Sequence, residues 1–194
     1  MFLVAATAGL AALGSYAGRN LSGVAAIVCF VIGIGLSFGI GFSRGSTPLS
    51  MGLLFGMGAF LGLGAGPGLA SYARLENGGT LIAQAAGMTA LLVGALGAYG
   101  YATRRDFSAW GKTLFWLTIG LFVAGIALIF VRSAGAQMIW AGLGVVIFSA
   151  WTIYDFNRLR RAHPKEAVFI ACGIFLDIFN LFQFLLQLIG FSRD

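Results

Sequence analysis

Seven apolar runs follow one another along the chain, separated by short connectors that carry most of the charges and helix breakers. Each run approaches the roughly 20 residues that a helix needs to cross the hydrocarbon core of a bilayer. The pattern therefore predicts an all-α fold, a bundle of seven transmembrane helices that forms a single transmembrane domain over residues 1–194. The expected spans are Met1–Ala17, Leu21–Phe42, Met51–Tyr72, Thr80–Tyr101, Thr113–Val131, Gln137–Phe156 and Ala167–Ile189.

Composition supports this assignment, because 59% of the 194 residues are hydrophobic, 9% are charged and the mean hydropathy is +0.94. A soluble domain has about 25% charged residues. The net charge of +6 does not indicate nucleic-acid binding, since the basic residues lie one to four at a time between apolar runs. We therefore expect the lipid bilayer as the main partner and no nucleic acid.

The distribution of basic residues predicts the orientation in the membrane. Of the 12 Lys and Arg residues, eight lie on the side that holds the N-terminus and the second, fourth and sixth connectors, and four lie on the other side. Cytoplasmic loops are enriched in Lys and Arg. The N-terminus is therefore expected in the cytosol and the C-terminus outside.

Two aspartates lie inside apolar runs, where a carboxylate is costly. Asp155 is near the end of the sixth run, and Asp177 is in the middle of the seventh. An ionised carboxylate near a bilayer centre costs about 2.5–3.5 kcal/mol on insertion scales. Each aspartate therefore needs a partner, a proton or water, and such intramembrane charges are usually functional.

Other polar residues recur on three of the predicted helices and form stripes. We expect these stripes to face one another across a polar interior, although amides and hydroxyls alone would be explained by hydrogen bonds between helices. Asn180, Gln183, Thr152 and Ser149 are the candidate lining residues of an ion path. The stripes consist of Ser37, Gly41 and Arg44 on the second helix, Ser149, Thr152 and Asp155 on the sixth, and Asp177, Asn180, Gln183 and Gln187 on the seventh.

The two aspartates constrain the chemistry if they meet. Close carboxylates in a low-dielectric site cannot both ionise cheaply, so the pair shares a proton and titrates jointly. A guanidinium from Arg44, on the same predicted side, would clamp one of them. The sequence therefore predicts a proton-controlled latch of Asp155, Asp177 and Arg44.

Several stretches resemble the transmembrane Bax inhibitor motif family, specifically its small prokaryotic members. The resemblance covers the chain from the second run onward. It rests on Tyr154-Asp155-Phe-Asn157, on Phe175-Leu-Asp177-Ile-Phe-Asn180-Leu-Phe182 followed by Leu185-Leu-Gln-Leu-Ile-Gly190, on the glycine-rich stretch that ends at Gly66-Pro67, and on Tyr101-Ala-Thr-Arg-Arg105.

The resemblance implies a seven-helix fold with a central last helix, in the inner membrane of a prokaryote. Bacterial members of the family are described as pH-sensitive calcium leaks governed by two aspartates and an arginine, which match Asp155, Asp177 and Arg44. Calcium is then expected as the permeant ion, held weakly by the two aspartates, and no cofactor is expected. Family members usually have a fuller first helix, so we expect the numbered start to lie inside that helix.

Two alternative functions fit the same residues. Some family members are described as non-transporting regulators that bind other membrane proteins, and the polar stripes would then stabilise a closed bundle. An intramembrane aspartyl protease also places two aspartates on consecutive spans. In such a protease the second aspartate follows a Gly-x-Gly pattern, whereas Asp177 follows Gly173-Ile-Phe-Leu. We therefore expect no enzyme.

A reporter fused after Asp194 tests the predicted orientation. Because the bias in basic residues places the C-terminus outside the cytosol, we expect a reporter that works only outside to be active there. A reporter that works only in the cytosol should be silent. The reverse pattern would contradict the orientation.

Overall fold

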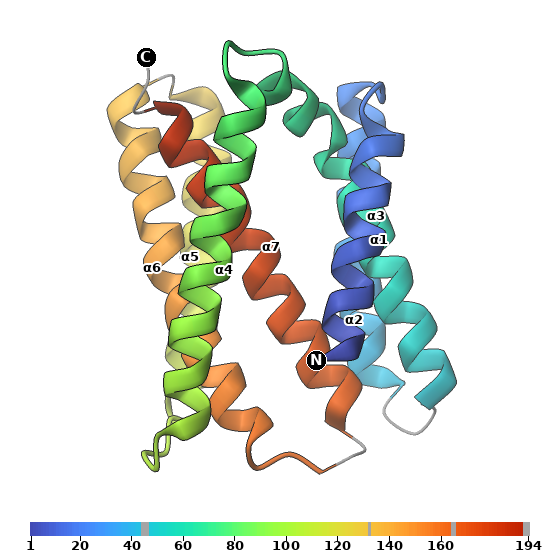
Figure 1. Cartoon of the computed structure of the whole chain (residues 1–194), viewed down its shortest axis with the longest axis vertical. Helices are drawn as coiled ribbons and strands as arrows, with labels where there is room; N and C mark the ends of the chain where they lie inside the picture. Colours follow the sequence, from blue (N-terminus) through green and yellow to red (C-terminus); the bar gives the residue numbers. More distant parts are fainter. Residues whose placement is uncertain (44–46, 132, 164–165, 192–194) are drawn as a thin grey trace. The chain divides into compact units, whose positions relative to one another are not determined.

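The computed structural model describes residues 1–43, 47–131, 133–163 and 166–191, and this part of the chain contains seven α-helices and no strand. The all-α prediction is therefore confirmed. Six of these helices are long and apolar enough to cross a membrane, and the remaining one, α1, is an apolar helix of 17 residues. The helices are α1 (Phe2–Gly18), α2 (Gly23–Phe42), α3 (Thr47–Ala73), α4 (Gly78–Ala102), α5 (Trp110–Phe130), α6 (Ala134–Leu159) and α7 (Ala167–Phe191) (Figure 1).

The chain divides into two compact units. The first comprises residues 1–79 and 162–175, and the second comprises residues 80–161 and 176–194. Helix α7 therefore contributes to both units. It is also the most buried of the six candidate spans. The prediction of a single transmembrane domain is not tested by this division.

In the first unit, α1 and α3 approach so closely that glycine is required at the contact. A Cβ atom on Gly62 of α3 would collide with the carbonyl oxygen of Ala11, and one on Gly18 of α1 would collide with that of Leu63. Small residues spaced four apart let helix backbones approach in this way. Figure 1 shows α1 and α3 side by side along most of their length.

In the second unit, two tryptophans of α6 join it to α5. Trp140 donates its indole N–H to the carbonyl oxygen of Leu121 at 2.7 Å, and Trp151 donates to Oγ1 of Thr118 at 2.8 Å. Buried indole N–H groups need such partners. The two tryptophans lie about three turns of α6 apart, and their acceptors lie within one turn of α5, so the two indoles converge on one part of α5 and restrict the rotation of α6 against it.

The same helix packs closely against α4 and α7. A Cβ atom on Gly144 of α6 would meet the ring of Phe184 of α7 at 2.6 Å, and that ring stacks on Phe148 with centroids 5.9 Å apart. A Cβ atom on Gly100 of α4 would collide with the carbonyl oxygen of Ile153. These contacts fix the half of α6 that carries the candidate functional residues.

A methyl group added at Gly62 tests the close approach of α1 and α3. We expect Gly62→Ala to lower the free energy of unfolding by about 1–3 kcal/mol, because the methyl group overpacks a contact with backbone atoms. Gly52→Ala is the matched control on the same helix, since no atom lies within 4 Å of a Cβ atom there. Unfolding by denaturant in detergent micelles measures both, and an equal effect of the two changes would contradict the close contact.

Candidate functional site

Asp155 and Asp177 are both buried inside helices of the second unit. Asp155 is 6% exposed and lies in the last turns of α6, and Asp177 is 4% exposed and lies near the middle of α7. Both positions are helical because apolar residues surround them and neither helix has a proline nearby. The structure therefore places two ionisable side chains within its apolar interior.

The two aspartates lie near enough to interact electrostatically. Asp155 acts on Asp177 as a neighbouring like charge, and Arg158, three residues further along α6, acts on Asp155 as an opposite charge. Two charges near one another in a low-dielectric interior interact far more strongly than in water. The two aspartates that the sequence singled out therefore lie within electrostatic range of each other.

One oxygen of this pair lacks a hydrogen bond. Oδ2 of Asp177 is the buried side-chain oxygen that has no partner in the described part of the chain. A buried polar atom left unpaired costs about 1–3 kcal/mol, and more if it is charged. Such an atom calls for an explanation, for example a proton, a water molecule or an ion that it receives.

The neighbouring polar residues bond within their own helices. Thr152, which is fully buried, donates from Oγ1 to the carbonyl oxygen of Phe148 at 2.9 Å. Asn180 donates from Nδ2 to the carbonyl oxygen of Leu176 at 2.8 Å. The Thr152 hydroxyl and one N–H of Asn180 are therefore used one turn back along the same helix.

The structure gives fewer contacts for the remaining residues that the sequence proposed for the site. Ser149 on α6 and Gln183 on α7 are half-buried in the second unit. Ser37 on α2, in the first unit, donates from Oγ to the carbonyl oxygen of Ile34 at 2.6 Å. Arg44 lies outside the described residues, so its predicted pairing with an aspartate stays a prediction.

Asn157 is a buried residue to which the sequence reasoning assigned no role. It is 1% exposed, and it donates from Nδ2 to the carbonyl oxygens of Gly100 and Arg105 at 3.1 Å each. Its Oδ1 accepts from the backbone N–H of Phe107 at 3.5 Å and from a guanidinium nitrogen of Arg161. One amide thus joins α6 to the end of α4 and to the loop before α5.

A sequence signal for this role exists in retrospect. Asn157 ends the motif Tyr154-Asp155-Phe-Asn157, one residue after the apolar run stops. The last carbonyl groups of a helix lack partners within that helix and need donors from elsewhere, and an amide side chain supplies two donors. The identity of the carbonyl groups that it meets depends on tertiary structure, which the sequence pattern does not contain.

The loop that contains Phe107 carries an ion pair at the surface. Asp106 accepts from Arg161 at 2.8 Å, from the Ser108 backbone N–H at 2.8 Å and from the Ser108 hydroxyl at 2.5 Å, all at Oδ1. The hydrogen bond from Arg161, followed by those from Ser108, holds the pKa of Asp106 well below its ordinary value. The same bond raises the pKa of Arg161.

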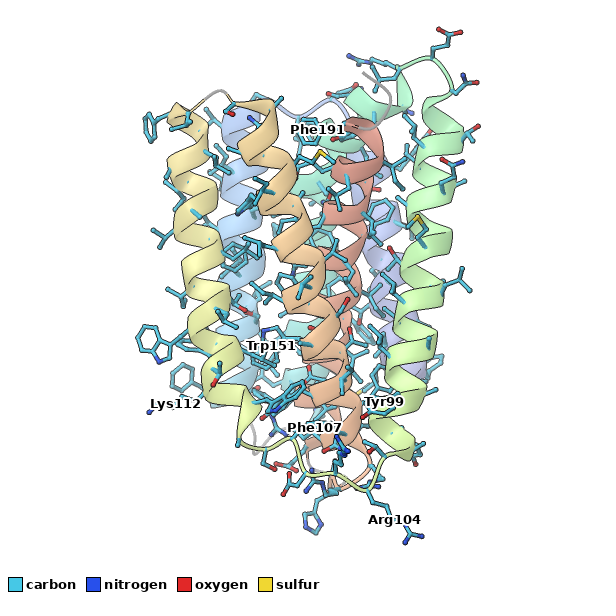
Figure 2. All side chains as sticks on the ribbon, turned by 90° about the vertical axis from the view of Figure 1, so that its left-hand side faces the viewer. Tyr99, Arg104, Phe107, Lys112, Trp151 and Phe191 are labelled. Atoms are coloured by element: carbon cyan, nitrogen blue, oxygen red, sulfur yellow. The ribbon has the colours of Figure 1, made fainter. Side chains whose placement is uncertain are left out.

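The sign of this shift decides when the ion pair is present. A lowered carboxyl pKa contributes stability above the ordinary pKa of the group, and that stability is lost as the pH falls through the lowered value. The pair of Asp106 and Arg161 therefore stays ionised at any physiological pH. Figure 2 shows Phe107 and Tyr99 at this end of the unit, while Arg104 points away. The ring centroids of Phe107 and Tyr99 are 6.4 Å apart.

The described residues contain no group of three or more His, Cys, Asp and Glu side chains that could hold a metal ion. The aspartate pair therefore supplies at most two carboxylate ligands, where a calcium site takes six to eight oxygen ligands in general.

Two substitutions separate a functional aspartate from a structural amide. We expect Asp177→Asn to leave the free energy of unfolding at neutral pH unchanged or higher, because it removes an ionisable group that has an unpaired oxygen. Asn157→Leu has a similar volume and should lower it by about 1–3 kcal/mol for each group left unpaired. Unfolding in detergent micelles measures both, and an equal loss in the two variants would make Asp177 a structural residue.

Comparison with known proteins identifies the family. A family model described as "Inhibitor of apoptosis-promoting Bax1" matches residues 1–194. An uncharacterized protein of Campylobacter jejuni is 31% identical over 162 residues, which are 84% of this chain and 70% of that protein. Protein lifeguard 4 of Mus musculus is 33% identical over 168 residues, 84% of this chain and 67% of that protein. Inner membrane protein YbhL of Escherichia coli is 31% identical over 117 residues, 55% of this chain and 50% of that protein. The chain belongs to the Bax inhibitor-like family of membrane proteins.

Proposed function

We propose that this integral membrane protein lets calcium ions pass down their gradient, and that a proton shared by Asp155 and Asp177, the aspartate latch, controls the passage. The observation that carries the proposal is the buried pair itself, in which the Oδ2 atom of Asp177 has no partner in the described chain. An atom of this kind is available to receive a proton or a cation. The resemblance to bacterial calcium leaks supports the choice of calcium.

The latch works through the charge of the pair. When the two carboxyl groups share one proton, they can hydrogen-bond to each other between α6 and α7 and hold these helices together. When that proton leaves, two negative charges face each other in a low-dielectric interior and either repel or recruit a cation. In the proposal the first state is closed, the second is open, and Arg44 clamps one carboxylate in the closed state.

The cation is bound weakly in this mechanism. Two carboxylates and the side-chain oxygen of Asn180 suit a hard cation such as calcium, but they are fewer than the six to eight ligands of a tight site. Weak binding favours passage, because an ion that binds tightly leaves slowly. Ser149, Thr152 and Gln183 would line the remaining path.

The proposed location follows from the relatives and the charges. YbhL, one relative, is named an inner membrane protein, which supports a bacterial inner membrane for this chain. The bias in basic residues supports a cytosolic N-terminus. In that orientation the Asp155 end of α6 is the cytosolic end, so the cytosolic pH would set the charge of the latch.

A second function has an observation in its favour. Thr152 and Asn180 donate to carbonyl groups of their own helices, so these donors are already satisfied, as in a closed and inert bundle. The protein would then act as a regulator that binds other membrane proteins and transports nothing. Lack of calcium flux in a reconstituted system would favour this function.

Reconstitution into liposomes with an enclosed calcium dye tests the proposal. We expect the wild type to admit calcium faster than empty liposomes and to change its rate between about pH 6 and about pH 8, as the shared proton dissociates. Asp155→Asn and Asp177→Asn should each abolish this pH dependence, because the amide is isosteric and does not titrate over this range.

Glu76→Gln is the matched control for these variants. It makes the same change of carboxylate to amide in the exposed connector between α3 and α4, and it should keep the wild-type pH profile. Calcium influx no faster than in empty liposomes at every pH would contradict the calcium function. Wild-type pH profiles in both aspartate variants would contradict the latch, because calcium would then pass without control by the aspartate pair.

A further inference from the structure

One arginine connects the water-exposed surface of the second unit to its buried amide. A single guanidinium nitrogen of Arg161 donates both to Asp106 and to the buried Asn157. The side chains of the ion pair are 41% exposed for Arg161 and 62% exposed for Asp106. We name Asp106, Asn157 and Arg161 the loop clamp, because together they hold the loop between α4 and α5 against the end of α6.

Every hydrogen-bonding position of the amide in this clamp is used. A side-chain amide has two N–H donors and an oxygen with two lone pairs. In Asn157 both donors reach carbonyl oxygens, one on α4 and one in the loop, and the oxygen accepts from the loop backbone and from Arg161. A rotation of this turn of α6 would break several of these bonds together.

The clamp shares its turn of α6 with the aspartate latch. Asp155 lies two residues before Asn157, and two residues of an α-helix are about 200° apart around the axis. The two side chains therefore leave α6 on nearly opposite sides. Asn157 faces α4 and the loop, while Asp155 interacts with Asp177 of α7.

The helix backbone between these residues has little room to move independently. The Gly100 position of α4, whose carbonyl oxygen accepts from Asn157, touches the backbone of Ile153 so closely that a Cβ atom would collide. The backbone N–H of Arg161 bonds to the carbonyl oxygen of Arg158 at 3.0 Å. The loop is therefore joined through Arg161 and Asn157 to the turn that carries Asp155.

We propose that Asn157 is a positioning residue for Asp155, and that the ion pair of Asp106 and Arg161 couples the loop between α4 and α5 to the aspartate latch. The inference rests on the proposed function, in which the latch gates calcium. Since both side chains of the ion pair are exposed, a molecule that binds the loop at the surface acts on the latch without entering the membrane. A release of the clamp lets the last turn of α6 rotate and alters the distance between the two aspartates.

Three variants of the full chain in lipid nanodiscs and liposomes test the coupling. Arg161→Gln removes the ion pair, Arg161→Lys keeps the cation, and Arg160→Gln removes a neighbouring charge that does not donate to Asp106 or Asn157. Hydrogen exchange at the backbone amides of residues 105–110 measures the opening of the loop. Calcium influx measures the latch in the same proteins.

We expect Arg161→Gln to speed the loop exchange by about fivefold, the upper range for an exposed ion pair, and to change the calcium influx rate relative to Arg160→Gln. Arg161→Lys should stay close to the wild type in both measurements, since it restores the charge. Faster exchange with an influx equal to that of Arg160→Gln would show that the loop is held without being coupled, and would overturn the inference. Unchanged exchange would overturn it as well.

A second comparison separates this inference from the proposed function. Coupling is reciprocal, so a change at Asp155 must alter the hydrogen exchange of the loop amides. We expect Asp155→Asn to alter the loop exchange in the wild-type background and to have no effect in the Arg161→Gln background. If the wild type admits no calcium but this pattern holds, the calcium function fails and the coupling stands. Loop exchange unaffected by Asp155→Asn would overturn the coupling.

Discussion

The low dielectric constant of a membrane interior is the constraint on which the rest of this structure depends. Water solvates a carboxylate almost anywhere on a protein surface, but inside an apolar bundle the group must find a partner or give up its charge. Asp177 lies in such a place, in the most buried of the candidate spans, and one of its oxygens has no partner in the described chain. Asp155 adds a second ionisable group within electrostatic range. The pair is costly for folding, and a proton or a cation reduces that cost.

The second unit positions the costly pair by fixing α6 on several sides. Two tryptophan N–H groups join it to α5, the ring of Phe184 fills the space above Gly144, and Asn157 bonds to α4 and the loop. These contacts are short and directional, so α6 has few alternative rotations. A small change in one contact can therefore be transmitted to Asp155 as a rigid displacement, because close-packed interiors transmit strain.

The surface ion pair and the buried aspartates respond to different conditions. The pKa of Asp106 is held well below its ordinary value by Arg161, so the clamp keeps its charges at physiological pH, whereas the latch that we propose exchanges a proton. The clamp and Asp155 lie at one end of α6, and in our proposal only the aspartate pair responds to pH. Under the two proposals together, the protein responds to protons at one place and to a surface contact at another.

The helices and the aspartate pair were predictable from the sequence because both depend on hydropathy. Long apolar runs have few alternatives to helices in a bilayer, and a charge inside such a run is conspicuous. The sixth run was predicted to end at Phe156, but α6 continues to Leu159. An apolar run ends at the first polar residues, whereas a helix continues as long as its backbone hydrogen bonds do. The partners of Asn157 and the unpaired oxygen of Asp177 depend on which helices become neighbours, and no periodicity in the chain encodes that. Arg44 lies outside the described residues, and its role rests on the sequence alone.

The titration of the two aspartates tests the central claim most directly. Infrared spectra of the carboxyl groups, recorded against pH with isotope-labelled aspartate in lipid nanodiscs, follow each group in the wild type and in the two asparagine variants. The account predicts that replacing either aspartate changes the titration of the other, because the two share one proton. If each remaining aspartate titrated as it does in the wild type, the carboxyl groups would be independent and the latch would not exist.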